Sequence, residues 1–194
     1  YNGTVVNSNV TTGEIQQMLS ATKYALSETY SSDSDITYIV NIVNNGSTAF
    51  TNLTLTDNLG AYAYETNTVY PLSYTSDIRY FINGVLQTAP TVTAGPPLVI
   101  TGINVPANSE AQIVYKARTT AYAPLDVETA ITNNIAVTGG GIAEPVTATE
   151  TVNAVVGAIL NIEKALNPTV VSENGQITYT FTITNKGNTA ITQA

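Results

Sequence analysis

The chain contains two copies of one segment. Residues 36–53 read ITYIVNIVNNGSTAFTNL and residues 177–194 read ITYTFTITNKGNTAITQA, with nine of the eighteen aligned positions identical. The same offset of 141 residues aligns Lys23 with Lys164 without a gap. A period of this kind indicates an array of structural units. The second copy ends after two or three expected strands, so we expect a partner to complete it or to cover its edge.

Hydrophobic and polar residues alternate along most of the chain. The alternation is clearest in residues 36–43, 53–57, 78–85, 113–118 and 131–137. Period two is typical of a β-strand with one buried face. The pair Asn83-Gly84 between two such runs predicts a hairpin turn, because both turn residues must adopt positive φ. Short strands separated by turn residues predict an all-β, Ig-like Greek-key sandwich, followed by the first strands of a second, incomplete sandwich repeat.

Three parts are expected along the chain. Residues 1–17 are an N-terminal strand segment and a candidate donor strand, residues 18–156 a complete Ig-like sandwich, and residues 157–194 a partial second repeat. The leading stretch 3–14 loosely resembles 139–150, which closes the complete domain. The N-terminus is therefore similar to the end of a domain, and the C-terminus to the beginning of one.

Composition excludes several classes of site. The 194 residues include no Cys and no His, which removes thiolate and imidazole metal sites and every His-based catalytic triad. The net charge of −8, with six Lys plus Arg, disfavours binding to nucleic acid. The longest apolar run, Ala154–Leu160, is too short to span a membrane. Asp33 and Asp35 are too sparse for a calcium site, and we expect no metal, no cofactor and no enzymatic activity.

Several short motifs occur in an order that resembles a known family. Lys23 in the first expected strand precedes I-T-Y-x-x-x-I-x-N-x-G-x-T-A at residues 36–49, L-T-x-T-D-x-L at 53–59 and N-x-I-x-V-T-G at 133–139. This order is similar to the Ig-like conserved repeat of bacterial and archaeal cell-surface proteins, called domain of unknown function eleven. The resemblance implies extracellular, tandem structural modules in stalks, surface layers or fibres.

The alternation of inward and outward side chains along the expected strands places three polar side chains on the core-facing side. Lys23, Asp57 and Asn133 each share a strand face with apolar residues. An unpaired buried charge is costly, so these side chains should meet. Burial lowers the pKa of an amine and raises that of a carboxyl group, which makes the amine a nucleophile and lets the acid polarise an amide. These conditions predict an autocatalytic Lys–Asn isopeptide bond, an arrangement that resembles pilin-type and adhesin-type Ig-like domains.

A simpler interpretation needs no covalent bond. Lys23 and Asp57 would form a buried ion pair with Asn133 as a hydrogen-bonding neighbour, or the lysine would extend to the domain edge. Lys164 aligns with Lys23, but the chain contains no asparagine aligned with Asn133 in the second repeat. An asparagine from a neighbouring subunit would make Lys164 a link between subunits.

These features together favour a structural subunit of an extracellular surface fibre, stalk or pilus-like filament. Residues 1–12 would complete the partial repeat of the next subunit by strand complementation, giving an open, head-to-tail homopolymer. One alternative is an adhesin-type module that recognises glycan or protein around residues 61–80. We expect the tyrosines in that region to serve packing or subunit contact instead. Another alternative is a cut fragment of a longer tandem-repeat surface protein.

Overall fold

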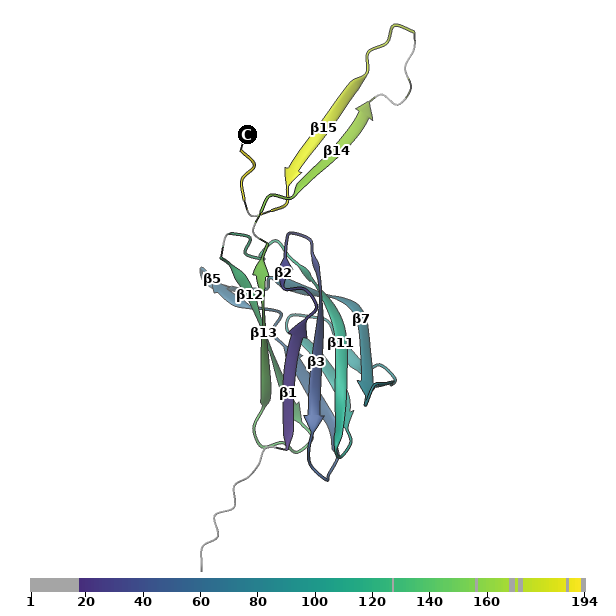
Figure 1. Ribbon diagram of the computed structural model, residues 1–194, viewed down its shortest axis with the longest axis vertical. Helices are drawn as coiled ribbons and strands as arrows, with labels where there is room; N and C mark the ends of the chain where they lie inside the picture. Colours follow the sequence, from purple (N-terminus) through teal and green to yellow (C-terminus); the bar gives the residue numbers. More distant parts are fainter. Residues whose placement is uncertain are drawn as a thin grey trace, which may run out of the picture.

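The computed structural model describes residues 18–126, 128–155, 157–167, 170, 173–187 and 189–192. The candidate donor strand at residues 1–17 lies outside these residues. Strands make up all the regular structure in the described part of the chain, and no helix is present there. Two larger sheets face each other, and two short hairpins stand apart from them (Figure 1).

The first sheet has five strands. From edge to edge they are β1 (Leu19–Ala25), β3 (Asp35–Asn44), β11 (Ser109–Thr119), β7 (Leu72–Ile82) and β8 (Val85–Leu86). The second sheet has six strands. They are β2 (Thr29–Tyr30), β13 (Val146–Ala154), β12 (Ala130–Gly139), β4 (Phe50–Asp57), β10 (Leu98–Val105) and β9 (Thr91–Thr93). The hairpins are β5 (Tyr62–Tyr64) with β6 (Asn67–Val69), and β14 (Leu160–Asn167) with β15 (Thr178–Asn185).

The chain passes between the two sheets several times. It leaves the first sheet after β3 to form β4, and again after β11 to form β12 and β13. Paired strands are antiparallel except β13 and β2, which run parallel. This arrangement confirms the predicted all-β, Ig-like Greek-key sandwich. The predicted boundaries of its three parts remain a prediction.

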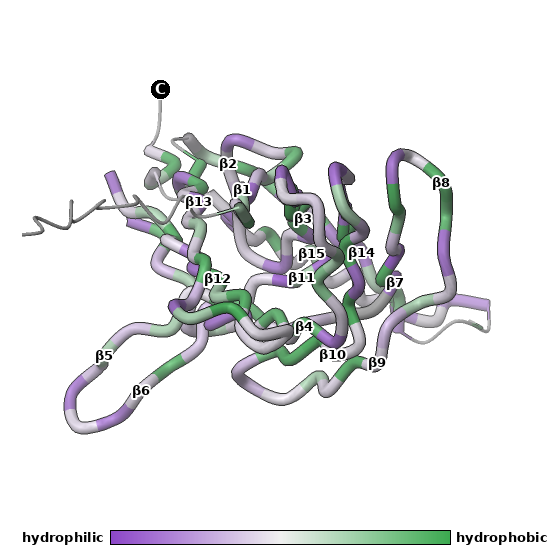
Figure 2. Tube along the Cα trace, turned by 90° about the horizontal axis from the view of Figure 1, so that it is seen from below, coloured by the Kyte–Doolittle hydropathy of each residue, from purple (hydrophilic) through white to green (hydrophobic). Residues whose placement is uncertain are grey.

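The period-two pattern explains how the sandwich closes. Along β3 every second residue is buried, and these residues are Ile36, Tyr38, Val40, Ile42 and Asn44. Successive side chains on a strand point to opposite faces, so one face of β3 enters the core. The facing sheet contributes apolar residues of β4 and β10, along which hydrophobic residues are concentrated in Figure 2. The predicted turn at Asn83-Gly84 joins β7 to β8 with φ values of 49° and 78°, which confirms it.

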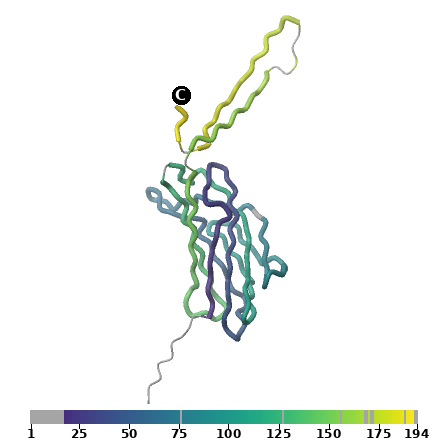
Figure 3. Tube along the Cα trace, in the orientation of Figure 1, coloured from purple at the N-terminus to yellow at the C-terminus, as the bar shows by residue number. Residues whose placement is uncertain are grey.

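The β14–β15 hairpin repeats the geometry of β1 and β3. Leu19 pairs with Asn44 in the sandwich, and Leu160 pairs with Asn185 in the hairpin, at the same offset. Lys23 likewise pairs with Val40, and Lys164 with Phe181. In Figures 1 and 3 this hairpin extends away from the sandwich. The two strand pairs thus share one register, and the assignment of β14 and β15 to a partial second domain stays a prediction.

The turns that follow β3 and β15 are held by the same two side-chain hydrogen bonds. The side-chain amide of Asn44 donates to the carbonyl of Thr48 at 2.9 Å, and its oxygen accepts from the backbone N–H of Gly46 at 2.9 Å. In the second repeat Asn185 donates to the carbonyl of Thr189 at 2.6 Å and accepts from the N–H of Gly187 at 3.0 Å. The N-x-G-x-T part of the repeated motif therefore encodes a specific asparagine-held turn.

Candidate cross-link site

Three strands from the two sheets bring the predicted site residues together. Lys23 lies in the middle of β1, Asp57 at the end of β4 and Asn133 in β12. Their exposed fractions are 3%, 0% and 0%. In the register of β4 and β12, Asp57 lies opposite Ile135, one inward-facing position along β12 from Asn133. The prediction that all three side chains enter the core is confirmed.

One oxygen of Asp57 is the centre of the site. Its Oδ2 accepts a hydrogen bond from Lys23 Nζ at 2.8 Å and a longer one from Asn133 Nδ2 at 3.4 Å. The hydroxyl of Tyr115 donates to the same oxygen. The other oxygen, Oδ1, accepts from the backbone N–H of Leu59 at 2.7 Å. Asp57 therefore faces both the amine and the amide nitrogen, and the predicted meeting of the three residues is confirmed.

Two tyrosines form one wall of the site. Lys23 Nζ lies 4.6 Å from the ring centroid of Tyr38, within the range of a cation–π interaction. The Tyr38 and Tyr115 rings are stacked, with centroids 5.7 Å apart. Neither tyrosine was predicted to belong to the site, because tyrosine is common on the inner face of strands. One sequence signal was available: the repeat preserves Tyr38 as Tyr179 together with the lysine.

Burial sets the protonation of the amine. Desolvation lowers the pKa of Lys23 from 10.5 to about 8, and the charges of Asp57 and Glu150 oppose this shift. A fraction of the amine is therefore neutral near physiological pH, which nucleophilic attack requires. Burial also raises the pKa of the Tyr115 hydroxyl, and the neighbouring Asp57 charge raises it further. Tyr115 thus remains a neutral hydrogen-bond donor.

The position of Asn133 corrects one expectation. The resemblance to pilin-type and adhesin-type Ig-like domains implies an asparagine on the last strand, but here β13 follows β12 and pairs with it. β1 is the edge strand of the first sheet, and β12 is an inner strand of the second. A Lys23–Asn133 bond would therefore join the two sheets across the core.

Lys164 has a different environment from Lys23. Its side chain is exposed, and Nζ lies 4.2 Å from the ring centroid of Tyr179 and 5.5 Å from that of Phe181. The lysine-over-tyrosine contact of the first repeat is thus preserved. The chain contains no residues aligned with Asp57 or Asn133 in the second repeat. The predicted role of Lys164 as a link between subunits stays a prediction.

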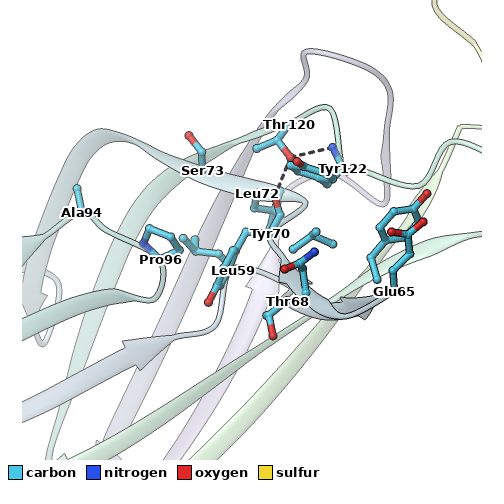
Figure 4. A pocket seen from close by; sticks show the side chains of 13 residues that line it. Leu59, Glu65, Thr68, Tyr70, Leu72, Ser73, Ala94, Pro96, Thr120 and Tyr122 are labelled. Carbon is cyan, nitrogen blue, oxygen red and sulfur yellow. Dashed lines mark hydrogen bonds between the residues drawn. The ribbon is translucent and has the colours of Figure 1, made fainter.

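The tyrosine-rich region around β5 and β6 divides into buried and exposed residues. Tyr80 is buried, whereas Tyr62 and Tyr64 are exposed and Tyr70 and Tyr74 are partly buried. A pocket of about 470 Å³ lies beside this hairpin (Figure 4). Its lining includes Leu59, Tyr64, Glu65, Tyr70, Pro96 and Tyr122. Packing explains only the buried part of the cluster.

The described residues contain no group of three or more acidic, His or Cys side chains that could hold a metal ion. They also contain no helix long and apolar enough to cross a membrane.

Comparison with known proteins gives similarity at the level of the fold. No family model matches the chain, and no curated protein matches it. A variant of BcpA, the major pilin subunit of Bacillus cereus, aligns with a TM-score of 0.54 and 13% identity, covering 87% of this chain and 56% of that chain. BcpA itself aligns with a TM-score of 0.52 and 11% identity over the same shares. A C-terminal fragment of the major pilin GBS80 of Streptococcus agalactiae aligns with a TM-score of 0.49 and 11% identity, covering 74% and 58%.

These alignments have two consequences. The sandwich is similar in fold to domains of BcpA, the major pilin subunit of Bacillus cereus. The chain spans a little over half the length of the BcpA chains that it matches.

Proposed function

We propose that this chain is a structural subunit of an extracellular surface fibre, stalk or pilus-like filament. The observation that carries the proposal is the β14–β15 hairpin. It has the register and turn of β1 and β3, but its apolar side chains are exposed where theirs are buried. Leu19, Tyr38 and Ile42 are 2%, 0% and 0% exposed. The aligned Leu160, Tyr179 and Ile183 are 52%, 49% and 64% exposed. An uncovered hairpin with apolar side chains is a site for pairing with another chain.

Strand complementation by the N-terminal segment of a neighbouring subunit fits this hairpin. In the sandwich β13 lies beside β1, and Ala25 N–H donates to Glu150 of β13 at 3.1 Å. Residues 3–14 resemble 139–150, with Glu14 aligned to Glu150. In the place of β13, this segment would lie beside β14 and bring Glu14 near Lys164. Such a contact is head to tail and gives an open filament. The motif order supports assignment to the Ig-like conserved repeat family and a cell-surface location.

Electron microscopy of the purified protein tests this assembly. We expect filaments from the intact chain and none after deletion of residues 1–12. A matched control keeps the composition of residues 1–12 in scrambled order, so that length and charge are unchanged. Filaments from the deleted or the scrambled chain would exclude this segment as the donor strand.

We also propose that the sandwich is hardened by an isopeptide bond between Lys23 and Asn133. The neutral Lys23 amine attacks Cγ of Asn133, so the Nζ–Cγ bond forms and the Cγ–Nδ2 bond breaks. One amine proton moves to the leaving nitrogen, which departs as ammonia. Asp57 Oδ2 contacts both nitrogens, at 2.8 Å and 3.4 Å, and is placed to transfer this proton. The reaction occurs once per domain, so the protein is not an enzyme with turnover.

Intact mass distinguishes the bond from a buried ion pair. The cross-linked chain lacks the mass of one ammonia molecule relative to its sequence. Asn133→Ala and Asp57→Ala should both keep the full sequence mass, whereas the exposed-site control Asn45→Ala should lose ammonia like the wild type. A wild-type chain of full mass leaves the simpler Lys23–Asp57 ion pair as the correct interpretation.

Lys164 extends the same chemistry to the contact between subunits. Its amine would need an asparagine from a neighbouring subunit or from a completed second repeat. Filaments linked in this way should give a ladder of oligomers in denaturing gels, which Lys164→Arg should abolish. A ladder that survives this substitution would show that another residue forms the link.

The pocket beside β5 and β6 supports a second candidate, an adhesin-type module for glycan or protein. Aromatic side chains such as Tyr64 and Tyr122 line it, and stacking on sugars uses such side chains (Figure 4). This candidate predicts a monomer with a ligand, and the microscopy above separates the two. A third candidate is a piece of a longer tandem-repeat surface protein, in which the rest of the same repeat covers β14 and β15.

A further inference from the structure

Two buried polar atoms in the described part of the chain lack a hydrogen-bond partner. They are the Tyr38 hydroxyl and the Asn133 side-chain oxygen, Oδ1. Both residues are 0% exposed, so bulk water cannot supply the missing hydrogen bonds. Buried polar atoms without partners are rare in folded proteins and need an explanation. Here one atom belongs to a donor and the other is an acceptor, so each could satisfy the other.

Both atoms lie in the cluster around Asp57. Asn133 Nδ2 contacts Asp57 Oδ2, and the Tyr38 ring stacks on Tyr115, whose hydroxyl contacts the same oxygen. Burial raises the pKa of Tyr38 by more than the Asn133 side chain lowers it, so the Tyr38 hydroxyl stays protonated and able to donate.

The carboxyl group of Asp57 is already committed to other partners. Its Oδ2 accepts from Lys23, Tyr115 and Asn133, and its Oδ1 accepts from the backbone of Leu59. It faces the nitrogen of the carboxamide and leaves the oxygen without a donor. A rotated carboxamide would bring two acceptor oxygens together while Asp57 is ionised. The donor for Asn133 Oδ1 must come from another residue.

We propose that Tyr38 is a catalytic residue of the Lys23–Asn133 reaction and donates a hydrogen bond to Asn133 Oδ1 as the amine attacks. The inference rests on the proposed cross-link. When Nζ bonds to Cγ, the carbonyl electron pair moves onto Oδ1. That oxygen stays negative until the Cγ–Nδ2 bond breaks and ammonia leaves. A donor already in place in a dry site stabilises this charge without reorganisation. Tyr38 would thus supply the oxyanion stabilisation while Asp57 moves the proton.

The second repeat gives independent support for a paired role of lysine and tyrosine. Lys23 Nζ lies 4.6 Å from the Tyr38 ring centroid, and Lys164 Nζ lies 4.2 Å from that of Tyr179. The hairpin holds this pair although its side chains are exposed there. One tyrosine can thus hold the amine against the face of its ring and donate a hydrogen bond to the carboxamide from its hydroxyl.

The rate of ammonia loss tests the proposal. The chain is made by cell-free synthesis, samples are stopped in strong denaturant at successive times, and intact mass gives the cross-linked fraction. Tyr38→Phe keeps the ring and removes the hydroxyl, and we expect roughly 100-fold slower ammonia loss, the effect of removing one oxyanion donor. The control is Tyr80→Phe, which removes another buried hydroxyl, bonded to the backbone of Asn104.

Two further measurements separate catalysis from damage to the fold. Far-ultraviolet circular dichroism should be the same for both variants and the wild type. A chain with 4-aminophenylalanine in place of Tyr38 keeps the ring and a donor, and should recover most of the rate even where the phenylalanine variant folds poorly. A Tyr38→Phe chain that cross-links at the wild-type rate overturns the role of Tyr38 alone. A wild-type chain that never loses ammonia overturns the proposed cross-link as well.

Discussion

At the residue scale, the burial of the Lys23 amine carries a cost in free energy. Its amine is more than nine-tenths buried and its pKa falls to about 8, mainly through desolvation. A buried ion pair is weak support for stability, because desolvation offsets the attraction to Asp57. A covalent bond would remove the charge of Lys23 permanently. The proposed reaction would therefore remove the free-energy cost of burying this charge, which gives the cross-link a thermodynamic reason.

The pH dependence of stability should reveal this burial in a chain that cannot cross-link. In Asn133→Ala, Lys23 has a folded pKa near 8 and an unfolded pKa near 10.5. Between these values the unfolded chain binds more protons, so the free energy of unfolding rises with pH, by roughly 3 kcal/mol in total. Urea unfolding followed by circular dichroism measures it. The control Lys23→Met with Asn133→Ala should lack this rise, and equal pH profiles would contradict the assigned pKa.

Asn44 is a second residue whose burial has a clear reason. Its side-chain amide donates to the backbone carbonyl of Thr48 in the following turn and to those of Val105 and Pro106 at the end of β10. Its oxygen accepts from the N–H of Gly46. The side chain thus holds the end of β3 against the end of β10 in the other sheet.

Replacing this asparagine should destabilise the sandwich strongly. We expect Asn44→Ala to lower the free energy of unfolding by roughly 3 kcal/mol, because several buried backbone groups lose their partners. The neighbouring side chain of Asn45 is exposed, and Asn45→Ala should change stability by less than about 0.5 kcal/mol. Urea unfolding of both variants gives the comparison. Similar values for the two would mean that the turn does not depend on the Asn44 side chain.

At the element scale, the two copies of the hairpin provide a matched experiment within one chain. Val40 in β3 is 0% exposed, and the aligned Phe181 in β15 is 60% exposed. Val40→Ser should destabilise the sandwich by roughly 3 kcal/mol, because it buries a hydroxyl and leaves a cavity. Phe181→Ser should leave unfolding of the sandwich unchanged but weaken filament formation, measured by sedimentation and microscopy. Undiminished filaments from Phe181→Ser would show that this face of the hairpin is not the contact surface.

The strands were predictable because alternation depends on the nearest neighbours in sequence. The runs predicted at residues 36–43 and 113–118 lie within β3 and β11, and the turn at Asn83-Gly84 needs only its own two residues. The sequence could not show which strands are neighbours across the sandwich. The pairing of β12 with β4, and the position of β13 beyond β12, depend on contacts far apart in the chain.

The candidate site was predictable only where a polar residue occupies a strand position that faces the core. Lys23, Asp57 and Asn133 stand out because each occupies a core-facing position that favours an apolar residue. Tyr38 and Tyr115 each have an apolar ring that suits a core-facing position and a polar hydroxyl at its end. The alternation of residues along the strand therefore did not distinguish them from ordinary core residues. Their roles depend on where each hydroxyl points, and this direction follows from packing between sheets.

At the scale of the whole molecule, the cross-link would change how force passes through a filament. β1 and β12 belong to different sheets, so no backbone hydrogen bonds of one ladder join them. The Lys23–Asn133 bond would bypass residues 24–132, which include most strands of the sandwich. Only β13, part of β12 and the first residues of β1 would remain in the direct path of the force.

Single-molecule stretching should therefore show a shortened extension. A pulled wild-type domain should release only the residues outside the bypassed segment, because the covalent bond carries the load around the rest. Asn133→Ala should add on the order of 400 Å of chain to each unfolding event, the extended length of residues 24–132. Lys23→Arg keeps the charge, cannot form the same amide readily and should behave like Asn133→Ala. Equal extensions for the wild type and Asn133→Ala would mean that no bond bypasses this segment, and the filament would then resist force through the strand ladders alone.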